Sequence, residues 1–221
     1  MFWKNDSVIE PKEVNENVLI QMSPSTKITK KTNVTVPPQY RAFAFVDHKH
    51  LCRIDSCIDK EFVKAYGKEY IGKQLQVAYV ANRTIAQSQW GFGNIQVNNE
   101  ALKEAYRIGA NGKFSIEIVD HVKLILTFPN EKEITIDQIR EKVISTIKTV
   151  GTPILSEYFS KTTTSVFEMS SLISDFRNKF MDALLNEKIF MNMGIKISML
   201  TVDGFHANED DLEIIRNRIN A

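Results

Sequence analysis

The 221-residue sequence predicts an α+β protein in which strands come first and helices follow. Residues 106–119 alternate strictly between apolar and polar side chains, the period of a long strand with one buried and one wet face. After Pro129 the apolar residues recur every three or four positions, as on a helix. We therefore expect a sheet rich in antiparallel pairs with one long bent strand, then helices and a final strand.

The N-terminal third predicts an arm followed by short strands. Residues 1–26 are polar and show little periodicity, so we expect an extended arm. Residues 27–36 suggest a strand that the following prolines end. The segments 42–46 and 51–54 predict two short strands, with turn residues at 47–49 between them.

Strand signals dominate the middle of the chain. Alternation predicts a strand at 75–80. The run 89–94 contains two glycines and predicts a turn, with a further strand starting at 95–97. Within the long strand, Gly109 and Gly112 favour a bend or bulge.

Helical spacing begins after the long strand. Thr135 and Gln138 match a capping box at the start of a helix that we expect to end at Gly151. Pro153 is well placed to start a second helix. A third helix follows, and we expect it to end at 192–194.

The last segment predicts a strand and a capped helix. Residues 195–203 alternate, and Asn208 precedes an acidic first turn that suits the positive end of a helix dipole. Three apolar residues of this helix, called the seam below, are spaced like the start of a heptad repeat: Leu212, Ile215 and Ile219.

These elements predict four parts. Residues 1–26 form the arm, 27–128 a β-rich first lobe, 129–205 a helical and β second lobe, and 206–221 the start of a C-terminal helix that resembles a truncated coiled coil. The boundary between the two lobes is placed after residue 128, where the spacing of apolar residues changes from that of a strand to that of a helix.

Composition narrows the class of partner. The chain has 28 Lys and Arg against 27 Asp and Glu, without the basic excess typical of a nucleic-acid binder. Two cysteines are too few for a disulfide framework.

The start of the chain shows no signal peptide. The most apolar stretch, 189–202, is well short of the ~20 residues that cross a bilayer. We expect a cytoplasmic protein that meets other proteins.

One cluster offers metal ligands: His48, His50, Cys52 and Cys57. These are the residue types of a tetrahedral zinc site, but their spacing matches no common zinc module. On a strand, His50 and Cys52 would share a face. A metal- or ligand-binding regulatory domain that uses these residues is therefore the alternative function. The same residues also fit an interpretation without a metal, in which the histidines lie in a turn and on the surface and the thiols are half-buried.

Asp120 and His121 look like an acid–base pair, which would suit a hydrolase. Adjacent residues at a strand end point in different directions, so we interpret Asp120 as the turn residue that closes the long strand. No recognisable nucleophile, phosphate-binding or dinucleotide motif is present. We expect no catalytic residue and no cofactor, and hence no enzyme.

Five residues are candidates for contact with a membrane surface. Lys27, Lys30 and Lys31 lie close together in the sequence, and anionic lipids attract such groups. Phe2 and Trp3 could enter a headgroup layer or pack on the domain.

The order of motifs resembles the SPFH (Band 7; stomatin, prohibitin and flotillin) superfamily. The matching segments are Trp3-Lys4-Asn5-Asp6, Tyr79-Val80-Ala81-Asn82-Arg83, Gln89-Trp90-Gly91, the long strand with Val119-Asp120, and Gly194-Ile195-Lys196-Ile197. The chain is most similar to the bacterial branch labelled virion-core-protein-like. It departs at Gln89, where the family usually has lysine, and at His121, where proline is common.

The resemblance implies a scaffold without enzymatic activity. Members of the family have a two-lobed α/β domain followed by a long helix, and they oligomerise into rings or cages on membranes. It implies a homo-oligomer, peripheral to a membrane, that organises membrane-protein partners.

Overall fold

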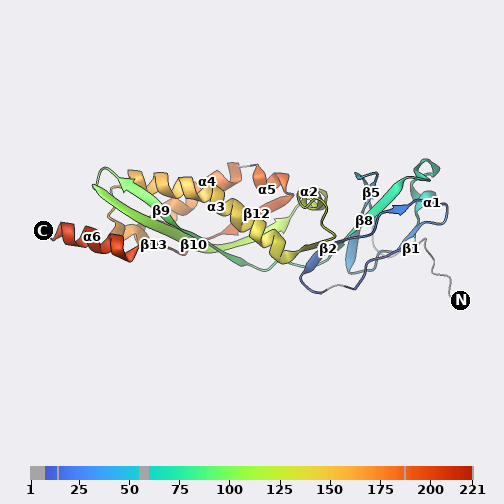
Figure 1. The fold of residues 1–221 in the computed structure, drawn as a ribbon, viewed down its shortest axis with the longest axis horizontal. Helices are drawn as coiled ribbons and strands as arrows, with labels where there is room; N and C mark the ends of the chain where they lie inside the picture. The colour runs from blue at the N-terminus through green and yellow to red at the C-terminus, as the bar shows by residue number, and fades with distance from the viewer. Residues whose placement is uncertain (1–7, 14, 55–59, 187, 221) are drawn as a thin grey trace. The chain divides into compact units, whose positions relative to one another are not determined.

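The computed structural model describes residues 8–13, 15–54, 60–186 and 188–220, and it confirms the α+β class (Figure 1). The chain forms two compact units, each described by itself. Unit 1 comprises Met1–Thr84 and Asp120–Ile139, and unit 2 comprises Ile85–Val119 and Arg140–Ala221. This division differs from the predicted lobes 27–128 and 129–205. The long strand belongs with the later helices because its other partners are the two last strands.

Unit 1 is built on an antiparallel sheet with strand order β11-β2-β8-β5-β6, in which β3 also pairs with β8. The strands are β2 (Val18–Met22), β3 (Thr26–Lys27), β5 (Tyr40–Val46), β6 (Lys49–Ile54), β8 (Gln74–Ala81) and β11 (Glu133–Thr135). A smaller sheet and short helices complete the unit: β1 (Val8–Ile9), β4 (Asn33–Val34), β7 (Lys60–Glu61), α1 (Phe62–Tyr66), the 3-10 helix η1 (Lys68–Tyr70) and α2 (His121–Thr127).

The predicted N-terminal arm is wrong for residues 18–22. They form β2, an inner strand between β11 and β8, and Val18, Leu19 and Ile20 are buried. Both faces of the strand are covered at this point, so consecutive residues are buried and the sequence shows no alternation.

The predicted hairpin of β5 and β6 is confirmed. Asp47 and His48 form its two-residue turn with φ values of 48° and 65°. Positive φ at both turn residues matches the right-handed twist of the flanking strands.

Unit 2 contains a second antiparallel sheet. Its strands are β9 (Ser88–Asn99), β10 (Glu104–Ile118), β12 (Ile195–Leu200) and β13 (Gly204–Ala207). β10 pairs with β9 along one edge and with β12 and β13 along the other. The long strand predicted at 106–119 is confirmed as β10.

The turn predicted at 89–94 is wrong, because these residues lie inside β9. Trp90 and Phe92 are buried, whereas Gly91 and Gly93 are exposed on the wet face. The glycines alternate with the aromatic residues, so they continue the strand and do not end it. The ladder is irregular at Gly109, as predicted, but the bulge lies on β9 and not on the long strand: Gly93 and Asn94 oppose the single residue Gly109.

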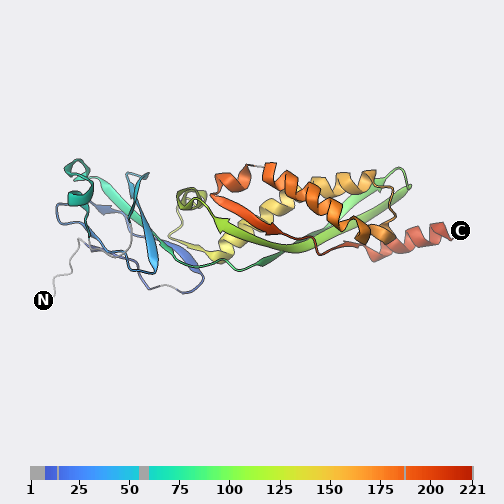
Figure 2. The same ribbon diagram turned by 180° about the vertical axis from the view of Figure 1, so that it is seen from behind.

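Helices α3 and α4 lie along one face of the unit 2 sheet (Figure 2). The helices of this region are α3 (Ile136–Lys161), the 3-10 helix η2 (Val166–Leu172), α4 (Ile173–Asn186), α5 (Ile189–Asn192) and α6 (Glu209–Ile219). The ring of Phe180 lies 5.5 Å from that of Trp90 and 6.3 Å from that of Phe92. These aromatic contacts join α4 to the buried face of β9.

Two predicted helix ends are wrong. α3 continues for 26 residues through Gly151 and Pro153. Gly151 is buried, and a Cβ there would lie 2.7 Å from the Phe92 ring, so this glycine provides space for packing. α4 ends at Asn186, and the separate helix α5 lies before Gly194, whose φ is 72°.

The helix starts predicted at Thr135 and Asn208 are confirmed, whereas the start predicted at Pro153 is wrong because this residue lies inside α3. The backbone N–H of Thr135 donates to Oε1 of Gln138 at 2.7 Å, and the N–H of Gln138 donates to Oγ1 of Thr135 at 3.1 Å. This is the expected capping box. Within the described residues, no helix combines the length and apolar character that crossing a membrane requires.

Candidate functional site

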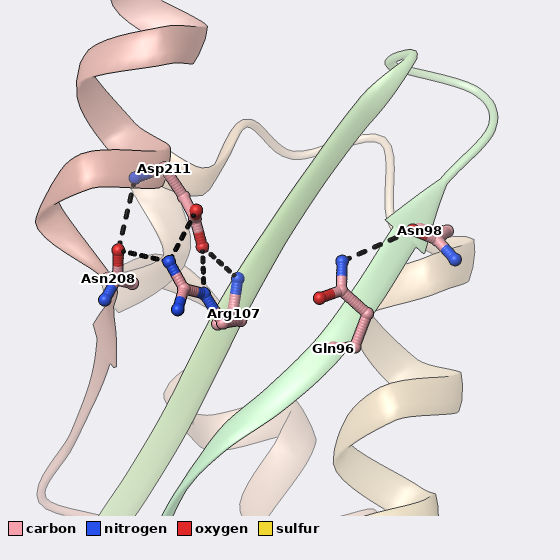
Figure 3. A network of polar contacts seen from close by, with 5 residues as sticks. All are labelled: Gln96, Asn98, Arg107, Asn208 and Asp211. Atoms are coloured by element: carbon pink, nitrogen blue, oxygen red, sulfur yellow. Dashed lines mark hydrogen bonds and ion pairs between the residues drawn. The ribbon is translucent and has the colours of Figure 1, made fainter.

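Helix α6 is fastened to the wet face of β10 by Arg107 (Figure 3). The guanidinium Nε and one terminal nitrogen donate to the two carboxylate oxygens of Asp211 at 2.9 and 3.0 Å. The same terminal nitrogen donates to Oδ1 of Asn208 at 2.9 Å. Two parallel bonds between arginine and carboxylate fix orientation as well as distance.

The backbone reinforces this anchor. The N–H of Arg107 donates to Asp211 at 2.8 Å, and its carbonyl accepts from the N–H of Asn208 at 2.9 Å. Asn208 is the N-cap of α6, and its side chain accepts from the N–H of Asp211. The helix start that the sequence predicted is therefore attached directly to the long strand.

The charges of the pair favour each other. Hydrogen bonding from Arg107 lowers the pKa of Asp211 below its ordinary value. Hydrogen bonding to Asp211 raises the pKa of Arg107. The Asp211 side chain is only 16% exposed, so solvent screens this ion pair less than a fully exposed one.

Further contacts hold α6 along its length. Arg218 donates to the carbonyl of Lys103 at 2.8 Å, and the guanidinium of Arg216 lies 5.5 Å from the ring centre of Phe167 in η2. The start of η2 approaches the same strand, because the N–H of Val166 bonds to the carboxyl of Glu104.

The predicted seam divides into two environments. Ile215 is buried at 3% exposure and Leu212 is half-buried, so these two residues pack within the chain. Ile219 is 65% exposed, and Ile214, which the sequence reading did not select, is 57% exposed. The exposed apolar surface of α6 is thus formed by Ile214 and Ile219.

A polar strip of β9 lies beside the anchor. Gln96 faces Arg107 across the ladder, and its amide nitrogen lies 3.5 Å from the amide oxygen of Asn98 (Figure 3). Both amides are exposed. This face of the sheet presents hydrogen-bonding groups without charge on β9.

The three proposed metal ligands that the structure describes, His48, His50 and Cys52, are not brought together. A register shift in the β5–β6 ladder places His50 opposite Phe45 and Cys52 opposite Ala44. His50 lies against phenylalanine rings, whereas Cys52 packs on the core cluster that contains Ala44, so the two do not share a face as predicted. His48 is in the turn, and Cys57 is outside the described residues. In the part of the chain that the structure describes, no three His, Cys, Asp or Glu side chains form a group suited to a metal.

Asp120 and His121 do not form an acid–base pair. The carboxylate of Asp120 caps α2 by accepting from the N–H of Lys123 at 3.0 Å. The imidazole of His121 stacks on Phe43 with ring centres 5.5 Å apart. Burial, and then the charges of Arg41 and Arg53, lower the pKa of His121, so the neutral ring is favoured. Both side chains have structural contacts of their own.

The three lysines among the candidate membrane contacts lie in unit 1. Lys27, Lys30 and Lys31 are all exposed, beside a turn in which the N–H of Thr29 donates to Oγ1 of Thr32 at 2.8 Å. Phe2 and Trp3 lie outside the described residues.

Two hollows could hold small groups. One, of about 530 Å³, lies along α3 and α4, where the hydroxyl of Tyr158 donates to Asp175 at 2.8 Å and Lys179 pairs with the same carboxylate at 3.2 Å. The other, of about 430 Å³ in unit 1, exposes mainly apolar surface from residues such as Phe45, Ile125 and Phe128, with polar residues such as Gln76 and Glu131 also in its lining. The charges of the first are paired with each other, and the second is suited to an apolar group.

Sequence reasoning missed two buried polar side chains. Glu104 and Tyr106 lie on the buried face of β10, and among the described residues Oε2 of Glu104 and the hydroxyl of Tyr106 have no hydrogen-bond partner. Burial raises the pKa of both, that of Tyr106 to about 12. Glu104 and Tyr106 lie on either side of an exposed residue, so they continue the alternation of the predicted strand toward its start. This pattern could have indicated that both side chains lie on the buried face.

No protein-family model matches the chain, and no curated protein matches it significantly.

Proposed function

We propose that the chain is a non-enzymatic, self-associating scaffold of SPFH type. It works in the cytoplasm, at the periphery of a membrane, where it organises membrane-protein partners. The order of motifs along the sequence and the α+β architecture with a C-terminal helix support this proposal.

The observation that carries the proposal is the anchored helix α6. The bonds from Arg107 to Asp211 and Asn208 set the direction in which α6 leaves the sheet. Along that helix Ile214 and Ile219 expose apolar surface to solvent. A fixed helix with exposed isoleucines offers a preorganised contact, since less freedom is lost on binding.

Sedimentation velocity of the whole chain tests this role. We expect the native chain to associate as its concentration rises. The dissociation constant of the Ile214→Asp, Ile219→Asp double variant should be at least tenfold higher. Asn217→Asp is the matched control, because it adds a charge at another exposed position of α6. A native chain that stays monomeric at high concentration would refute the proposal.

A further inference from the structure

The outer edge of β9 is long, exposed and uncharged. None of its 12 residues is charged, and none is proline. Within the described residues β9 pairs only with β10. Natural proteins commonly protect an open edge with charge, proline or a covering element, so an edge without charge or proline favours pairing with another strand.

The register shows where the backbone groups of this edge point. Gly91 faces Asn111, whose carbonyl accepts from the N–H of Asp203 on the opposite side of β10. Facing residues in an antiparallel ladder exchange either both hydrogen bonds or none. Gly91 therefore directs its N–H and C=O toward the open edge, and so does Gln89 opposite Lys113.

The two halves of the edge differ. In the second half the hydroxyl of Ser156 on α3 donates to the carbonyl of Gln96 at 3.2 Å. The first half, residues 88–93, ends at the bulge, whose two residues are Gly93 and Asn94. The available edge is thus 88–93, with Gln89, Gly91 and Gly93 exposed.

We propose that residues 88–93 pair antiparallel with the same strand of a second copy, around a twofold axis at Gly91. The inference rests on the proposed self-association and names one of its contacts. In this register Gly91 faces Gly91 and Gln89 faces Gly93, so small residues meet at the centre.

The absence of charge on β9 favours a second copy of the chain as the partner of residues 88–93. A twofold contact brings identical side chains together, and any charge at its centre would repel itself. This strand has none, and the whole chain has a formal net charge of only +1, so long-range repulsion between copies is weak.

Gly91→Lys tests the contact. A Cβ at Gly91 meets ordinary contacts at 3.6 and 3.7 Å, and its φ lies outside the left-handed region, so the substitution fits the folded chain. We expect sedimentation equilibrium to show at least tenfold weaker association, because two lysines would face each other. Gly91→Asp should weaken it similarly, and an equimolar mixture of the two variants should restore association.

Asn111→Lys is the matched control. It adds the same charge to the same face, one strand inward, and should change association less than twofold. Amide exchange gives a second readout: the N–H groups of Gln89 and Gly91 should exchange more slowly as the concentration rises.

Three outcomes would overturn the inference. Association that is unchanged by Gly91→Lys, or amides that stay unprotected in an associated chain, would remove strand pairing and leave self-association through α6 standing. A strictly monomeric native chain would overturn both proposals.

Discussion

At the scale of single residues, alternation assigned Arg107 to the wet face of the long strand but gave no partner for it. Its partners Asn208 and Asp211 lie about a hundred positions later, and only the pairing of β13 with β10 brings them near. The prediction that His50 and Cys52 share a face was wrong for a related reason. The register shift that separates His50 from Cys52 depends on β5, and periodicity within β6 cannot reveal it.

Gly151→Ala should destabilise the protein although alanine favours helices. The gain in helix propensity is about 1 kcal/mol, whereas overpacking a core costs about 1–3 kcal/mol. The new Cβ would lie within 2.9 Å of the rings of Phe92 and Phe180. We expect a net loss of up to about 2 kcal/mol in the free energy of unfolding, measured with urea.

Glu141→Ala is the control for this prediction. It changes an exposed residue of the same helix and should alter the unfolding free energy by less than about 0.5 kcal/mol. A stabilised Gly151→Ala variant would show that the rings move aside without cost.

The contribution of Asp211 to stability should depend on pH. Because its folded pKa is lowered, the ion pair with Arg107 stabilises the protein above the ordinary pKa of aspartate, and this contribution disappears as the pH falls through the lowered value. The unfolding free energies of the native chain and Asp211→Asn should therefore differ at pH 6 and converge toward pH 3. An equal difference at both pH values would contradict this.

At the scale of elements, short sequence patterns correctly predicted the features that depend on neighbouring residues, such as helix caps and strand alternation. The capping box at Thr135, the N-cap at Asn208 and the alternation of β10 were all correct, because each depends on residues within a few positions. The errors concern tertiary context: β2 is buried by partners distant in sequence, and α3 continues through Gly151 because aromatic rings occupy that face.

At the scale of the whole molecule, the two proposed contacts, strand pairing between copies and lysine binding to lipid, should respond differently to salt. Pairing of uncharged strands should be nearly independent of ionic strength, whereas attraction of exposed lysines to anionic lipid is screened within a Debye length of about 8 Å at 0.15 M salt. The two contacts therefore differ in their response to salt.

Vesicle cosedimentation tests the membrane contact. We expect the native chain to bind vesicles with 30% phosphatidylserine more strongly than pure phosphatidylcholine vesicles, and salt to weaken this binding. The triple variant Lys27→Glu, Lys30→Glu, Lys31→Glu should reduce binding at least fivefold, since these side chains are exposed. A triple Lys→Glu change at Lys142, Lys148 and Lys188, exposed lysines outside this group, is the control. Equal loss in both variants would point to overall charge alone.

The interleaved order of the two units has a consequence during translation. Unit 1 is complete in sequence once residue 139 has left the ribosome, while residues 140–221 are still being synthesised. Until β12 and β13 emerge, the hairpin of β9 and β10 lacks the strands that cover its second edge. Neighbouring nascent chains on one messenger would then have both edges open. Under the proposed strand pairing, the pace of elongation through the last third would therefore affect which edge of one copy meets another.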